Sequence, residues 1–91
     1  MVDLKQYIPE DDSWIENYFA VMGETELISY YNNIFVYLLN MPPRTHFNIL
    51  QEVKPENYEL FIKCVYTCIR ELTTYGFNFS IENDVTLVCK W

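Results

Sequence analysis

The hydrophobic residues of this chain change their spacing at Gly76. Before Gly76, apolar side chains recur every three or four residues, which is the period of an amphipathic α-helix. After it, Phe77, Phe79 and Ile81 alternate with polar residues, which is the period of a half-buried strand. The sequence therefore predicts a mainly helical α+β fold in which the helices precede a C-terminal β-hairpin, and the length of 91 residues predicts a single domain.

Four helices are predicted from their start and stop signals. Gly23 is a natural end for the first helix, and Pro42 and Pro43 end the second because proline lacks the N–H that the next helical hydrogen bond needs. At the first helix, Ser13 and Glu16 have the spacing of a capping box. The predicted helices cover residues 14–22, 26–40, 46–52 and 56–74.

The predicted hairpin has two strands that turn at residues 82–84. A loop of these three residues places all inward-facing side chains on one face of the hairpin. Trp91 continues the inward series, so we expect it to be structured although it is the last residue. The pairs in this register are Ile81 with Val85, Phe79 with Leu87 and Phe77 with Cys89.

The net charge of −7 is concentrated in residues 1–43, where seven acidic residues face Lys5 alone. Residues 44–91 hold six acids and five bases, so a local basic patch can form there. An acidic field repels phosphate backbones and anionic lipids, which disfavours nucleic acid and a membrane as partners. The cluster at residues 10–12 suggests a weaker alternative, an acidic inhibitor that occupies a nucleic-acid site on an enzyme.

The three cysteines, Cys64, Cys68 and Cys89, are expected to be free thiols. Their odd number and the absence of an export pattern at the N-terminus favour a reducing compartment, so we expect a cytoplasmic protein. Cys64 and Cys68 lie in the apolar stripe of the predicted helix 56–74. Core packing is therefore expected for them, rather than a zinc site completed by His46 or Cys89.

Catalytic motifs are not found in the sequence. His46 is the only histidine, and we expect a surface or capping position for it. The only glycines are Gly23 and Gly76, so no glycine-rich phosphate loop exists. We expect a protein that is not an enzyme and that holds no metal and no cofactor.

The order of elements in residues 45–91 resembles a winged helix-turn-helix domain. A short helix (46–52), a tight turn with Pro55, a longer helix (56–74) and a two-stranded wing follow one another. In that family the second helix of the pair enters the major groove of DNA. The resemblance implies a DNA-contacting set made of Arg44, Lys54, Asn57, Lys63 and Lys90.

The same predicted helix departs from the pattern of DNA readers. Glu56 and Glu59 stand where such helices present cationic or amide side chains, and each carboxylate weakens the attraction to phosphates. Either the domain reads DNA only with a partner, or the scaffold serves protein contacts.

Tyrosines crowd into the predicted helix 26–40. Tyr30, Tyr31 and Tyr37 cannot all face the interior of a domain this small, and tyrosine is enriched at protein interfaces. The three residues form the candidate interaction surface, although tyrosines can also simply cover the edge of a core. The leading hypothesis is a non-enzymatic protein-interaction or regulatory module with an unidentified protein partner. A DNA-binding winged helix is the alternative, and a homodimer stays open.

Overall fold

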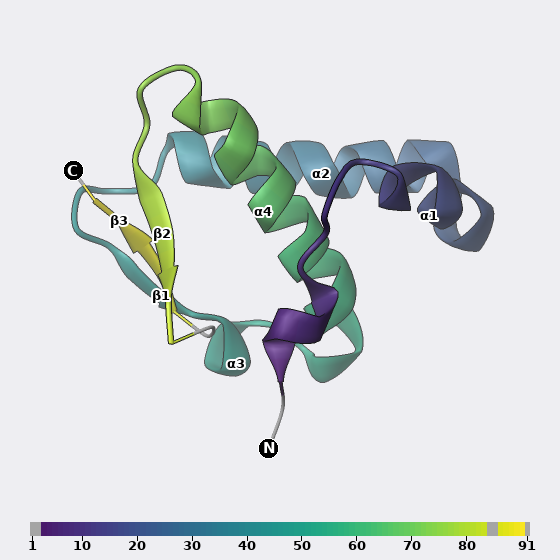
Figure 1. Ribbon diagram of the computed structural model, residues 1–91, viewed down its shortest axis with the longest axis horizontal. Helices are drawn as coiled ribbons and strands as arrows, with labels where there is room; N and C mark the ends of the chain where they lie inside the picture. Colours follow the sequence, from purple (N-terminus) through teal and green to yellow (C-terminus); the bar gives the residue numbers. More distant parts are fainter. Residues whose placement is uncertain (1–2, 84–85, 91) are drawn as a thin grey trace.

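The computed structural model describes residues 3–83 and 86–90. Within these ranges the chain forms four α-helices, two short 3-10 helices and a three-stranded antiparallel sheet (Figure 1). The predicted fold class, mainly helical α+β, is confirmed, and helices followed by a small sheet are compatible with a winged-helix-like arrangement. The helices are η1 (Leu4–Tyr7), α1 (Trp14–Met22), α2 (Glu24–Leu39), α3 (Ile49–Glu52), η2 (Pro55–Asn57) and α4 (Tyr58–Thr73), and the strands are β1 (His46–Asn48), β2 (Phe79–Glu82) and β3 (Thr86–Cys89).

Glycine and proline set the ends of the long elements, as predicted. Gly23 has φ = 87° and Gly76 has φ = 93°, in the left-handed region where a side chain would be strained. The capping box at α1 is wrong. Ser13 holds the cap position, but its backbone is helical and its side chain makes no capping bond. Its N–H instead donates to Oδ1 of Asp11 at 2.9 Å.

The predicted helix 46–52 is half wrong. Residues 46–48 form strand β1, and only residues 49–52 are helical. β1 pairs with β3 through Phe47 and Leu87. The expected two-stranded wing, β2 and β3, is therefore part of a three-stranded sheet with the order β1-β3-β2. The cause is nonlocal, because an edge of β3 offers backbone partners that a short helix would leave unpaired.

The predicted hairpin register is also wrong, by two residues. Phe79 lies opposite Cys89 and Ile81 lies opposite Leu87. A shift of two keeps every side chain on its predicted face, because the period of a strand is two. Val85, which the predicted register paired with Ile81, and Trp91 lie outside the described residues.

Helix α4 lies at the centre of the fold (Figure 1). It contacts α2 on one side and η1 on the other. The main core, which α1, α2, α4 and the sheet share, includes the fully buried Cys64 and Cys68. A smaller cluster of Leu4, Ile49, Tyr58 and Ile62 lies under η1. The positions of both cysteines in the core are thus confirmed.

No helix in residues 3–83 and 86–90 has the length and apolar character required to cross a membrane.

Candidate interaction site

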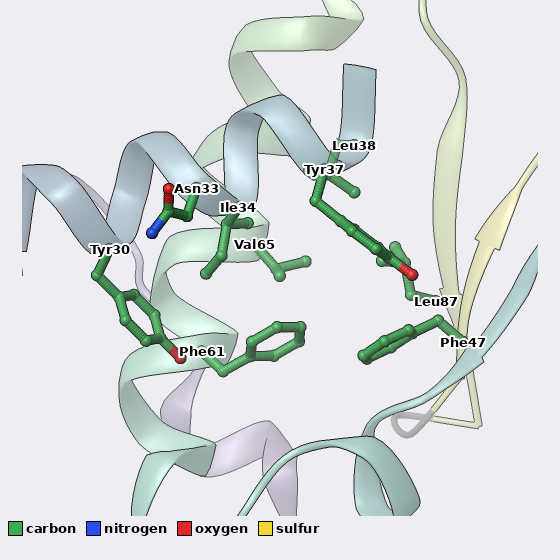
Figure 2. A pocket seen from close by; sticks show the side chains of 9 residues that line it. All are labelled: Tyr30, Asn33, Ile34, Tyr37, Leu38, Phe47, Phe61, Val65 and Leu87. Atoms are coloured by element: carbon green, nitrogen blue, oxygen red, sulfur yellow. The ribbon is translucent and has the colours of Figure 1, made fainter. Parts of the chain in front are cut away.

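An open pocket of about 300 Å³ lies between α2, α4 and the sheet (Figure 2). Figure 2 shows Tyr30 and Tyr37 reaching down from α2 and Phe61 and Phe47 facing them from α4 and β1. Because four aromatic rings line it, we call it the aromatic pocket. Its lining consists of Tyr30, Asn33, Ile34, Tyr37, Leu38, Phe47, Phe61, Val65 and Leu87.

Helical and strand periodicity explain why these residues converge. Tyr30, Asn33 and Tyr37 follow one another at spacings of three and four, so they share one flank of α2. Phe61 and Val65 repeat this spacing on α4. Phe47 and Leu87 come from neighbouring strands and occupy the same row of the sheet.

Three of the rings already contact one another. The Tyr37 and Phe47 rings meet edge to face, with centroids 5.7 Å apart and planes at 67°. The Phe47 and Phe61 rings are stacked, with centroids 5.7 Å apart and planes at 19°. Both arrangements are favourable for aromatic quadrupoles. The rings are therefore held in place before anything binds.

The aromatic pocket carries no charge, and α2 carries none beyond Glu24 and Glu26 in its first turn. No Asp, Glu, Lys, Arg or His lines the pocket, and none occurs between Glu26 and Arg44, which covers most of α2. Burial raises the pKa of Tyr30 to about 12, followed by the smaller effect of Cys64 nearby, so the phenol is neutral at physiological pH. The available polar groups are the two phenol hydroxyls and the Asn33 amide.

The three predicted interface tyrosines separate into two groups. Tyr30 and Tyr37 share the aromatic pocket, and Tyr37 is 49% exposed. Tyr31 lies on the other flank of α2, where it stacks on Phe35 and its hydroxyl donates to Glu71 at 3.1 Å. Burial, followed by the effects of Cys68 and Glu71, raises the pKa of Tyr31. Tyr31 therefore helps to join α2 to α4.

The five candidate DNA contacts do not form one patch. Lys63 donates to the carbonyl oxygen of Tyr7 at 3.3 Å, and Lys90 forms an ion pair with Glu82 at 3.1 Å. Lys54 and Asn57 line a hollow beside the aromatic pocket. Arg44 is exposed in the turn before β1, with a positive φ of 63°.

The outer side of α4 is covered by residues 3–13, which we call the N-terminal strap. Arg70 donates to the carbonyl oxygen of Pro9 at 3.1 Å, as Lys63 does to that of Tyr7. The adjoining helix α1 adds a bond from Trp14 Nε1 to Thr67 Oγ1 at 3.2 Å. The basic side chains of α4 are thus used within the fold.

Helix α1 also contacts the first turn of α4. The Tyr18 hydroxyl donates to Oε2 of Glu59 at 2.7 Å. Burial raises the pKa of Tyr18, and the hydrogen bond to Glu59 raises it further. Glu59, which the resemblance places on a DNA-facing surface, therefore faces α1.

Cys64 and Cys68 lie one turn apart in α4, whereas Cys89 and His46 lie on strands β3 and β1. Burial raises the pKa of the Cys64 thiol to about 12 and that of the Cys68 thiol to about 11. His46 is exposed on β1, which confirms its predicted surface position. Across residues 3–83 and 86–90, no three His, Cys, Asp or Glu side chains are grouped as metal ligands would be.

No protein-family model, curated protein or solved structure was found to match this chain.

Sequence reasoning missed Phe47 and Phe61 as site residues. Phe61 was counted with the apolar stripe of its helix, and Phe47 was assigned to a helix that is in fact a strand. A usable signal existed for the helix above them, because α2 is rich in tyrosine and free of charge over residues 27–43.

Proposed function

We propose that this chain is a non-enzymatic interaction module that binds a partner protein through the aromatic pocket. The observation that carries the proposal is an open, uncharged pocket lined by four aromatic rings on a protein of net charge −7. Interface cores are depleted of charge and enriched in aromatic residues, whereas a solvated face of an acidic protein carries charged groups.

Exposed apolar side chains also occur next to Tyr37 in α2. Val36, Tyr37 and Leu39 of α2 are 54%, 49% and 41% exposed. They lie in the uncharged run of residues 27–43, so a partner could cover them without stripping water from an ion. Tyr37 joins these residues to the pocket, where it provides the kind of aromatic anchor that often dominates binding.

We further propose a winged-helix-like scaffold that works in the cytoplasm. The helix pair α3 and α4, followed in the sequence by strands β2 and β3, supports this proposed scaffold. The three free, buried cysteines suit a reducing compartment. DNA binding by α4 is the alternative. The structure gives it little support, because Lys63 bonds to the N-terminal strap and Glu59 accepts a hydrogen bond from α1.

Photo-crosslinking tests the proposed surface. The photoreactive residue p-benzoylphenylalanine replaces Tyr37 in one variant and Val21 in the control, since Val21 is 75% exposed and does not line the aromatic pocket. We expect the probe at position 37 to crosslink to one discrete protein in an extract of the source cells. Phe61→Ala in the same chain should remove that crosslink. Equal labelling from both positions, or none, would contradict the proposal.

Fluorescence anisotropy with a random DNA duplex tests the alternative. We expect negligible binding at low salt. A salt-dependent affinity tighter than about 10 μM would place DNA binding first.

A further inference from the structure

The aromatic pocket has the size for one large side chain. Its volume is about 300 Å³, whereas an apolar cavity of about 150 Å³ already accepts benzene. Pockets for whole small-molecule ligands begin at about 300 Å³ and extend to about 1,000 Å³. An indole or phenol ring therefore fits, and the volume is at the lower limit for a whole small-molecule ligand.

The chemistry of the walls selects a neutral group. Ile34, Leu38 and Val65 lie behind the aromatic rings, are at most 8% exposed and carry no charge. A charged side chain that entered would lose hydration among the rings and would find no counter-charge in the lining. Aromatic rings can bind a cation through their faces, but the stacked rings of Phe47 and Phe61 already cover one face each.

The rings favour an aromatic guest over an aliphatic one. Tyr37, Phe47 and Phe61 form a series of edge-to-face and stacked contacts, and Tyr30 closes the other end of the pocket (Figure 2). A further ring can continue this series with the same geometry, whereas a leucine gains only area. The polar groups of the lining are the Asn33 amide and the hydroxyls of Tyr30 and Tyr37.

From these observations we infer that the aromatic pocket receives a single uncharged aromatic side chain, which the partner presents on an uncharged segment. The inference rests on the proposed function and specifies the chemistry of the partner. Where the segment crosses α2 it is uncharged, because α2 offers no charge after Glu26 to pair with one.

The test uses isolated probes and the full chain. N-acetyl-tryptophanamide, N-acetyl-leucinamide and choline are titrated separately into ¹⁵N-labelled protein, and amide shifts are followed by NMR. We expect saturable shifts with N-acetyl-tryptophanamide at millimolar concentration, centred on Tyr37, Phe47 and Phe61. Binding of N-acetyl-leucinamide should be at least fivefold weaker. Tighter binding of choline, or shifts centred elsewhere, would overturn the inference.

Matched variants locate the binding. Tyr37→Lys places a charge at the pocket, whereas Val21→Lys places it on the exposed side of α1, outside the pocket lining. We expect Tyr37→Lys to weaken binding of N-acetyl-tryptophanamide at least fivefold and Val21→Lys to leave it within twofold. Phe61→Leu keeps an apolar wall but removes a ring, so it should lower the preference for tryptophan over leucine. An unchanged preference would contradict the role of the rings.

The outcomes separate this inference from the proposed function. Crosslinking from position 37 without binding of N-acetyl-tryptophanamide would leave the interaction surface standing and reject the aromatic guest. Loss of both would reject both. Dimerisation of the protein that Tyr37→Lys abolishes would identify the occupant as a second copy and overturn the inferred separate partner.

Discussion

The two sides of α4 differ in how they are closed. On the outer side, Lys63 and Arg70 donate hydrogen bonds to backbone carbonyls of the N-terminal strap. Leu4 of the strap is buried in the smaller core cluster. On the inner side, Phe61 faces the rings of the aromatic pocket, which stays open. The difference shows that one helix can use its charged face for folding and leave an uncharged face available for binding.

The comparison bears on the winged-helix-like interpretation. A helix that reads DNA must present an exposed cationic face to phosphates and base edges. In this protein Lys63 and Arg70 donate to backbone carbonyls of the N-terminal strap, and Lys63 is partly buried while Arg70 stays exposed. DNA binding through Lys63 would therefore require its bond to the strap to break, whereas the aromatic pocket is open without rearrangement.

The largest expected effect concerns the anchor of the N-terminal strap. Leu4 is 2% exposed and packs in one cluster with Ile49 and Ile62. Leu4→Ala should lower the free energy of unfolding by about 2–3 kcal/mol, the lower part of the range for a buried leucine, because a strap near the terminus can detach instead of leaving a cavity. Urea denaturation measures the loss.

The control for Leu4→Ala is Val21→Ala, at a position 75% exposed. It should change the free energy of unfolding by less than about 0.5 kcal/mol. A loss below 0.5 kcal/mol for Leu4→Ala as well would show that the strap is not anchored there.

Alkaline pH should weaken the core that both sides of α4 share. Burial raises the pKa of Cys64 from 9.0 to about 12, so above pH 9 the unfolded chain releases a proton that the folded chain keeps. The contribution to stability is thus complete below pH 9 and is lost as the pH rises toward 12. We expect the melting temperature to fall by roughly 5–10 °C between pH 8.5 and 11.

Cys64→Ala identifies the source of the alkaline effect. At neutral pH the variant should have a free energy of unfolding lower by about 1–2 kcal/mol, because packing around the thiol is lost. Its melting temperature should then decline less steeply with rising pH. Parallel curves for the two proteins would assign the decline to other groups.

A smaller effect is expected where Lys63 holds the strap. Lys63→Met keeps most of the apolar stem but removes the bond to the Tyr7 carbonyl, so we expect a loss of about 1 kcal/mol in the free energy of unfolding. Limited proteolysis should cut the strap faster, while binding of N-acetyl-tryptophanamide at the aromatic pocket should persist.

Lys54→Met is the matched change, since the exposed Lys54 lines a hollow on the other side. It should leave both the free energy of unfolding and the rate of strap cleavage unchanged. If Lys54→Met and Lys63→Met had equal effects, the carbonyl contact would not be what holds the strap.

The smallest effect on stability is expected in the aromatic pocket. Tyr37 is 49% exposed and contacts Phe47 at its edge, so Tyr37→Ala should lower the free energy of unfolding by about 0.5–1 kcal/mol, the lower part of the range for an aromatic pair. The same change should abolish measurable binding of N-acetyl-tryptophanamide. Thermal denaturation and NMR titration of one sample provide both numbers. A large loss of stability without loss of binding would reverse the assignment of the two sides.

Local signals in the sequence were enough for the three longer helices α1, α2 and α4, but not for the predicted helix 46–52. Gly23, Gly76 and the pair Pro42 and Pro43 mark their ends because backbone conformation at these residues is restricted or released by their own covalent structure. The predicted inward positions Phe79, Leu87 and Cys89 of the hairpin are buried, since periodicity depends only on neighbours a few residues away. For the same reason, the tyrosine-rich segment could be recognised before its surroundings were known.

The site and the sheet required tertiary structure. Strand β1 exists because β3 offers it a backbone partner some forty residues later. The hairpin register could not be predicted from periodicity, because both registers place the same side chains on the inward face. The N-terminal strap carries no local mark of the Lys63 and Arg70 side chains that bind it. Sequence alone determined which residues are apolar and where helices stop, because these are properties of short segments. Only the tertiary structure decided that Phe47 meets Phe61 and Tyr37, because that contact joins three elements far apart in the chain.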